Sequence, residues 1–158
     1  MEDELFMRRA LELAREAADE GEVPVGCVVV RDGEIVGEGR NRREEKKSAL
    51  SHAETEAIAA ACARLGDWRL EGCALYVTLE PCPMCAGAIL NARVSTLVYG
   101  AEEPRSGCCG SVLDLFEEDF GWHPRVYGGV LAAESAALLA EFFARLREKD
   151  APPPAKNQ

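Results

Sequence analysis

Four residues in two short segments carry side chains suited to metal chemistry. His52 and Glu54 are separated by one residue, and Cys82 and Cys85 stand three apart in the run 81–85, Pro-Cys-Pro-Met-Cys. An imidazole nitrogen beside two thiolates is a ligand set that favours zinc. Three such ligands leave a fourth tetrahedral position open, where zinc lowers the pKa of water toward about 7. The sequence therefore predicts one Zn²⁺ per chain, held by His52, Cys82 and Cys85.

Glu54 is the residue predicted to move protons, because it lies near His52 without having to bind the metal. A carboxylate there can take a proton from water and return it to a substrate. The run 51–54 also resembles a capping box, with Ser51 as the N-cap and Glu54 bonding back to its N–H. The Pro-Cys-x-x-Cys motif favours catalysis, because a capping box requires neither a histidine within it nor a thiolate pair downstream.

A Cys-x-x-Cys step has two other interpretations, a redox pair and half of a structural zinc site. A redox pair does not need the His-x-Glu segment, and a closed site needs a fourth ligand, which Cys62 or Cys73 would have to supply. Cys62 lies among helical alanines and Cys73 begins a strand, and both settings are typical of buried thiols. The remaining cysteines have no partner at ligand spacing and are expected to pack in the core: Cys27, Cys108 and Cys109.

The length and composition indicate a single domain. The chain has 158 residues, 47% of them hydrophobic, which is enough for one core. We expect one zinc-dependent domain over residues 1–150 and a disordered proline-rich tail over 151–158. Seven cysteines, an odd number, do not suggest a disulfide framework, and a reducing cytoplasm is expected. No apolar run approaches the roughly 18 to 20 residues of a membrane span, so neither a signal peptide nor a membrane segment is predicted.

Apolar spacing and turn residues predict the elements that position these side chains. The predicted helices cover residues 4–20, 51–65, 83–92, 112–118 and 131–149. The predicted strands cover residues 25–31, 34–39, 74–78, 94–99 and 125–127, with the dipeptide Asp32-Gly33 turning the first strand back into the second. This order predicts a three-layer α/β/α sandwich around a mixed sheet. Both chemical motifs then begin helices, whose positive amino ends favour thiolates.

His-x-Glu followed by Pro-Cys-x-x-Cys is the signature of zinc-dependent base deaminases. Within the cytidine/deoxycytidylate deaminase superfamily, the chain resembles the bacterial tRNA adenosine deaminases, which convert the wobble adenosine to inosine. The resemblance extends from the first helix to about Lys149. It is carried by residues 22–26, 39–42, 52–54, 75–88 and 107–111 and by the helix containing Phe142 and Phe143.

The resemblance implies a cytidine deaminase-like fold with a five-stranded sheet, usually as a homodimer, and hydrolytic deamination at C6 of adenine with Glu54 carrying the protons. Asn41 is expected to hydrogen-bond the flipped base or its ribose, and Glu80 with Pro81 to shape the edge of the pocket. The full set of substrate-binding residues that it implies is Asn41, Ala53, Glu80, Pro81, Glu103 and Arg105.

Two positions depart from the family pattern. Glu103 stands where the family commonly has Asp, and Trp122 stands where Asn often precedes the late histidine. Both positions are expected near substrate nucleotides. His123 itself can either line the site or be an ordinary loop residue.

Charge bears on the substrate. The formal net charge of −10 argues against indiscriminate nucleic-acid binding, which depends on Lys and Arg. Local basic clusters are nevertheless present, at Arg40, Arg42, Arg43, Lys46 and Lys47 and again at Arg145, Arg147 and Lys149. They are either solvated charge or, with Arg105, a surface that binds the tRNA anticodon stem-loop. Three alternatives stay open: a free-base or nucleoside deaminase of the guanine or cytosine type, a non-catalytic zinc module, and a thiol redox protein.

Overall fold

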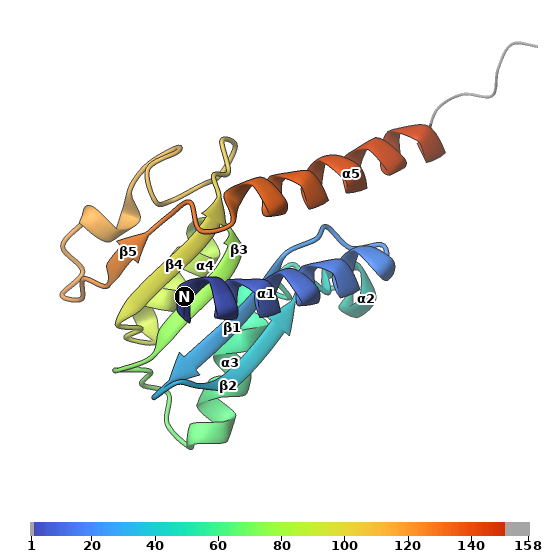
Figure 1. Ribbon diagram of the computed structural model, residues 1–158. Helices are drawn as coiled ribbons and strands as arrows, with labels where there is room; N and C mark the ends of the chain where they lie inside the picture. The colour runs from blue at the N-terminus through green and yellow to red at the C-terminus, as the bar shows by residue number, and fades with distance from the viewer. Residues whose placement is uncertain (1, 151–158) are drawn as a thin grey trace, which may run out of the picture.

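The computed structural model describes residues 2–150, which form a five-stranded sheet between two layers of helices (Figure 1). The strands are β1 (Gly26–Arg31), β2 (Glu34–Arg40), β3 (Ala74–Leu79), β4 (Thr96–Ala101) and β5 (Arg125–Tyr127). The helices are α1 (Glu2–Asp19), α2 (Arg43–Lys46), α3 (Ala53–Leu65), α4 (Pro83–Asn91) and α5 (Ala132–Asp150), with a short 3₁₀ helix, η1 (Leu115–Glu117).

The sheet is mixed, as the sequence predicts, and its order is β2-β1-β3-β4-β5. Strand β1 is antiparallel to both of its neighbours, while β3, β4 and β5 run parallel to one another. The β1–β2 turn is the predicted hairpin: Asp32 and Gly33 both have positive φ, at 50° and 78°. A two-residue turn with positive φ at both positions matches the right-handed twist of the strands that it joins.

Both faces of the sheet are buried, because alternate side chains of its central strands enter two different clusters. Cys27 and Val29 of β1 face the layer of α3 and α4, while Val28 and Val30 face α1. Strand β3 alternates in the same way, with Leu75 and Val77 on the α3 side and Tyr76 on the α1 side. Helix α5 lies on the α1 side of the sheet and extends beyond it (Figure 1). The predicted three-layer sandwich is confirmed.

The segments that carry the chemical motifs meet at one edge of the sheet, the edge at which β2 and β3 end. Strand β3 ends at Leu79, and α4 begins four residues later at Pro83. Strand β2 ends at Arg40 on the same edge, because β2 and β3 both run antiparallel to β1, which lies between them. The chain from β2 passes through α2 and begins α3 at Ala53. The amino ends of α3 and α4 therefore open at the same edge of the sheet.

The structure corrects several predicted elements. The predicted helix at 112–118 is reduced to η1. The side chain of Asp114 caps the amino end of η1 by accepting a hydrogen bond from the N–H of Phe116. Strand β4 begins at Thr96 instead of at 94, because Ser95 N–H donates to the Cys73 carbonyl before the regular ladder starts. Helix α2 lies between the predicted strand 34–39 and the predicted helix 51–65, where no regular element was predicted. The predicted tail, 151–158, lies outside the described residues, and within 2–150 no helix has both the length and the apolar character to cross a bilayer.

Gly37 tests how closely α3 must approach the sheet. A Cβ at this position would lie 2.4 Å from the Ala57 carbonyl oxygen and 2.7 Å from the Ala61 nitrogen. We expect Gly37→Ala to lower the free energy of unfolding by about 1–3 kcal/mol, because such overpacking forces the backbone apart. Gly87→Ala is the matched control: it has nothing within 4 Å of the added Cβ, and its place inside α4 favours alanine by about 0.5–1 kcal/mol. Urea unfolding with equal midpoints for the two variants would contradict this account.

Candidate metal centre and active-site pocket

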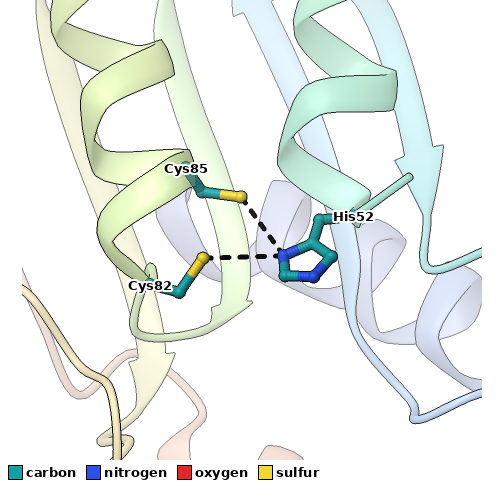
Figure 2. Close-up of side chains that lie close together, drawn as sticks. All are labelled: His52, Cys82 and Cys85. Atoms are coloured by element: carbon teal, nitrogen blue, oxygen red, sulfur yellow. Dashed lines mark hydrogen bonds between the residues drawn. The ribbon is translucent and has the colours of Figure 1, made fainter. Parts of the chain in front are cut away.

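The predicted metal ligands lie together at the facing ends of two helices (Figure 2). His52 is the N-cap of α3, Cys82 is the N-cap of α4, and Cys85 lies in the first turn of α4. The Nδ1 atom of His52 lies 3.6 Å from the Sγ of Cys82 and 3.5 Å from the Sγ of Cys85. All three candidate ligand atoms lie within 4.8 Å of one another.

These separations fit a tetrahedral zinc ion. Zinc binds sulfur at about 2.3 Å and imidazole nitrogen at about 2.0–2.1 Å, so two such ligands at a tetrahedral angle lie about 3.6 Å apart. The two sulfur–nitrogen distances, 3.6 and 3.5 Å, have this value. Cys85 is fully buried, whereas His52 and Cys82 are half-buried and line a cavity. The three side chains can therefore hold a metal beside that cavity.

The electrostatics of the cluster favour a thiolate. Hydrogen bonds from Cys85 and His52 lower the pKa of Cys82 to about 4. The same contact raises the pKa of Cys85, as does its burial, and contact with Cys82 raises the pKa of His52. Cys82 also lies at the positive amino end of α4, which stabilises negative charge. Cys82 is therefore the first of the two thiols to ionise, which suits a metal ligand.

Glu54 lies in the first turn of α3 and faces the same cavity. Its side chain is buried, and this burial raises its pKa to about 7. The capping interpretation of Glu54 is wrong, because the N–H of Ser51 donates to the Ser48 carbonyl. The N-cap of α3 is His52, whose own N–H donates to Oγ1 of Thr55 at 3.1 Å. The carboxylate is thus free of a structural role at the helix end and can exchange protons near neutral pH.

A cavity of about 190 Å³ opens in front of the cluster. Its lining residues come from five segments: Val23, Val25, Asn41, Arg43, His52, Ala53, Glu54, Leu79, Glu80, Cys82, Glu103 and Ser106. Four of the six residues implied by the family resemblance for substrate binding are therefore in place: Asn41, Ala53, Glu80 and Glu103. Pro81 is buried, and Arg105 is exposed on the loop that follows β4. Neither belongs to the lining of the cavity.

The side chain of Asn41 is held in place by hydrogen bonds with two backbone groups. Its Oδ1 accepts from the N–H of Arg43 at 3.1 Å, and its Nδ2 donates to the Val23 carbonyl at 3.3 Å. An amide carries two donors and two acceptor positions, so one of each is left for a ligand in the cavity. The two backbone contacts fix the orientation in which Asn41 presents them.

Glu80 contributes to the cavity in a way that the sequence does not indicate. Its carboxylate turns into the loop that follows β4, where it accepts hydrogen bonds from Glu103, Cys109 and Ser111. Burial acts to raise the pKa of Glu80, but the hydrogen bonds of Ser111, Glu103 and Cys109 outweigh it and lower that pKa below its usual value. Both carboxylate oxygens are engaged by this loop.

Sequence reasoning missed Glu22, a buried carboxylate in addition to Glu54 and Glu80. Its oxygens accept from the N–H groups of Glu44 at 3.0 Å and Glu45 at 2.8 Å, so it caps α2 from 22 and 23 residues away. The one local signal in the sequence for this role of Glu22 was the position of a charged residue just before the apolar run 23–30. The apolar lining residues Val23, Val25 and Leu79 were missed for the same reason: their approach to the cavity depends on the fold.

Trp122 and His123 do not belong to the lining of the cavity, and the expectation that Trp122 lies near substrate nucleotides stays a prediction. The indole Nε1 of Trp122 donates to the Val94 carbonyl at 2.7 Å, just before β4 begins. Strand β4 starts at the edge of the sheet opposite the site. The exposed ring of His123 contacts the Phe116 carbonyl at 3.2 Å, so it is a loop residue.

The other five cysteines behave as predicted. Cys27, Cys73 and Cys108 are buried in the larger core cluster, and Cys62 and Cys109 pack against it. Burial raises the pKa of each of them, which keeps these thiols protonated and unreactive.

Comparisons with known proteins agree with this geometry. The chain is 47% identical to the tRNA-specific adenosine deaminase of Bacillus subtilis over 149 residues, covering 94% of this chain and 92% of that protein. A solved structure from a study of A-to-I editing by tRNA:A34 deaminases, 45% identical, superposes with a TM-score of 0.82 and covers 85% of this chain and 98% of that one. A guanine deaminase from Nitrosomonas europaea is 28% identical, with a TM-score of 0.73 over 89% of this chain and 84% of that one.

Residues 1–101 match the sequence profile of the cytidine and deoxycytidylate deaminase zinc-binding region. That span contains the whole His52–Cys82–Cys85 cluster and Glu54. The chain therefore belongs to the cytidine and deoxycytidylate deaminase family.

Proposed function

We propose that the chain is a zinc-dependent hydrolase that converts adenosine to inosine at the wobble position of tRNA, with residues 1–150 forming one deaminase domain. The observation that carries the proposal is the convergence of His52, Cys82 and Cys85 on a cavity that also contains the buried Glu54. The similarity to tRNA-specific adenosine deaminases at 47% identity supports the choice of substrate.

In the proposed reaction, water replaces the amino group at C6 of adenine and ammonia leaves. Zn²⁺ bound by His52, Cys82 and Cys85 would supply Lewis acidity that makes water nucleophilic at neutral pH. Glu54 takes the proton released by the attacking water and delivers protons to the ring nitrogen and the leaving amine. Asn41 holds the nucleotide through its remaining amide donor and acceptor.

Arg43 is the basic residue best placed for RNA, because it lines the cavity and follows Asn41 closely in the chain. Its neighbours are partly neutralised: Lys46 pairs with Glu56 at 2.8 Å, and Arg42 lies 3.7 Å from Glu45. Arg145 pairs with Glu141 on α5, the helix that extends away from the sheet (Figure 1). The basic contribution to RNA binding is therefore centred on α2, next to the pocket.

The leading alternative is a deaminase of free bases or nucleosides. The resemblance to a guanine deaminase, at 28% identity and a TM-score of 0.73, means that the same fold and zinc chemistry serve such an enzyme. The tRNA:A34 deaminase study supplies a closer match on both measures, at 45% and 0.82. A non-catalytic zinc module does not require a buried Glu54 in an open cavity. A redox pair does not require His52 beside both sulfurs.

We also propose a homodimer in a reducing cytoplasm. Apolar side chains are exposed around the loop and short helix that follow β4, a kind of surface that commonly marks a protein interface. These side chains are Val112, Leu113 and Phe120, exposed by 55%, 47% and 58%.

The free thiols Cys62 and Cys109, both half-buried, suit a reducing compartment.

Metal content tests the ligand assignment. The wild-type protein should carry one zinc per chain, and Cys85→Ser should carry well below one, because a hydroxyl replaces a buried thiolate ligand. Cys62→Ser is the matched control and should keep its zinc, since Cys62 packs against the core away from the cluster. Elemental analysis of protein purified without chelator provides the measurement. A metal-free wild type with a Cys82–Cys85 disulfide would establish the redox alternative instead.

Glu54→Ala separates proton transfer from structure. We expect this variant to keep its zinc and its unfolding midpoint while the deamination rate falls by at least about 10²-fold, the usual loss when a general acid–base group is removed. Glu71→Ala, which removes an exposed carboxylate, should retain the wild-type rate. Single-turnover kinetics on stem-loop RNA measure both. Turnover near the wild-type rate in Glu54→Ala would exclude the proton-carrying role, and loss of zinc would make Glu54 a ligand.

Substrate choice is tested by offering an anticodon stem-loop with adenosine at the wobble position beside free adenosine, guanine and cytosine. We expect the stem-loop to be deaminated far better than any free compound, with products resolved by mass. Binding should weaken as salt rises, because contacts with phosphates release counterions. Efficient turnover of a free base, with an inert stem-loop and no effect of salt, would establish the free-base deaminase.

The Arg42→Ala/Arg43→Ala variant locates the RNA-binding surface. It should bind the stem-loop more weakly and lower the slope of log K against log salt by roughly 0.7 for each phosphate that the variant no longer neutralises, the value for single strands. Zinc content should not change. Arg31→Ala/Arg69→Ala is the matched control, because both side chains are exposed at the opposite edge of the sheet. Equal weakening in the two double variants would mean that α2 has no special role.

A further inference from the structure

The loop between β4 and η1, residues 102–114, forms one wall of the cavity and is built around a single side chain. Glu103 and Ser106 of this loop line the cavity. Oε1 of Glu80 accepts from the N–H of Glu103 at 3.0 Å and also from the hydroxyl of Ser111. Oε2 of Glu80 accepts from the N–H of Cys109 at 2.8 Å and from the N–H of Ser111 at 3.2 Å. One carboxylate thus receives four hydrogen bonds from both ends of the loop segment 103–111.

The loop also encloses this carboxylate closely. Glu80 is 2% exposed, and a Cβ added at Gly107 would lie 2.4 Å from its Cδ atom. Glycine at this position is therefore required by the approach of the carboxylate, since Gly107 has no positive φ to explain it. The loop is further tied to the same stretch of chain by the N–H of Cys108, which donates to the Pro81 carbonyl at 2.9 Å.

The position of Glu80 in the chain connects this loop to the metal cluster. Glu80 follows the last residue of β3 and precedes the ligand Cys82 by two residues. Its own N–H donates to the Ala101 carbonyl at the end of β4, so its backbone is fixed to the sheet. The carboxylate thereby sets the distance between the wall containing Glu103 and Ser106 and the cluster of His52, Cys82 and Cys85.

We propose that Glu80 is a positioning residue for substrate binding: it holds the 103–111 wall against the nucleotide without contacting the reacting atoms. The inference rests on the deaminase function proposed above and assigns the carboxylate of Glu80 to the loop instead of to the substrate. Because each donor is a polar group that needs an acceptor, weakening the carboxylate should loosen the wall and lower affinity for the substrate. Proton transfer by Glu54 should be largely unaffected.

Glu80→Gln tests this with little change of shape, because it replaces one acceptor oxygen by an amide that donates toward N–H groups. We expect the KM for the stem-loop to rise by about tenfold, in line with leaving a buried donor without its acceptor. The kcat should change much less, and zinc should remain at one per chain. Amide hydrogen exchange should accelerate in 103–111 and stay unchanged in α3. Glu117→Gln, which removes the same charge from an exposed side chain, should match the wild type in all four measurements.

Ser111→Ala provides a second route that keeps Glu80 and removes one donor from it. It should raise KM by a few-fold, and this effect should disappear in the Glu80→Gln background, because both changes act on one contact. Ser111→Ala alone decides the question if Glu80→Gln does not fold. An unchanged KM in the variants, loss of zinc in Glu80→Gln, or a fall in kcat at constant KM would overturn the proposal. A wild-type protein inactive on the stem-loop would instead refute the proposed function itself.

Discussion

The amino ends of α3 and α4 meet at one edge of the sheet, and the rest of the site depends on that meeting. It brings Nδ1 of His52 to within 3.6 Å of both cysteine sulfurs. Each helix end carries partial positive charge, which favours the thiolate of Cys82 at this place. The meeting is in turn fixed by the sheet: α4 starts almost as soon as β3 ends, and α3 lies on β2 where Gly37 and Gly39 allow backbone contact.

The walls of the cavity have a different origin from the metal cluster. Two of them are a four-residue helix and an irregular loop, which cannot be held by ladders of sheet hydrogen bonds. Each is fixed by one buried glutamate instead: Glu22 accepts from the amino end of α2, and Glu80 accepts from the 103–111 loop. A carboxylate that accepts several hydrogen bonds from N–H groups forms stronger contacts than neutral acceptors do. The pocket thus combines a cluster placed by regular structure with walls placed by individual charges.

The difference between a cluster held by regular structure and walls held by individual side chains explains what the sequence could predict. Cys82 and Cys85 are spaced by about one helical turn, and His52 and Glu54 lie in an equally short motif. The Asp32-Gly33 turn and the alternation along β1 are local signals too. The fold and the ligand set could therefore be predicted from sequence. Helix α2 could not, because its cap is 22 residues away, and neither could the loss of regular helix in 112–118, where the backbone follows contacts of the loop. The contact of Trp122 with the Val94 carbonyl could not be predicted for a similar reason, since the two residues are 28 apart in sequence.

An acidic protein can still suit an RNA substrate, because at physiological ionic strength exposed charges interact over only about 8 Å. The acidic residues behind the net charge of −10 occur along the whole chain, and most of them lie outside the cavity lining, which contains Glu54, Glu80 and Glu103. At the mouth itself, Lys46 and Arg42 lie beside the acidic partners Glu56 and Glu45, which leaves Arg43 as the cation that borders the pocket. Such an arrangement attracts phosphate at one position and repels it elsewhere. It favours a substrate whose shape delivers a base to the pocket over general affinity for nucleic acid, as expected for single-stranded loops with splayed bases.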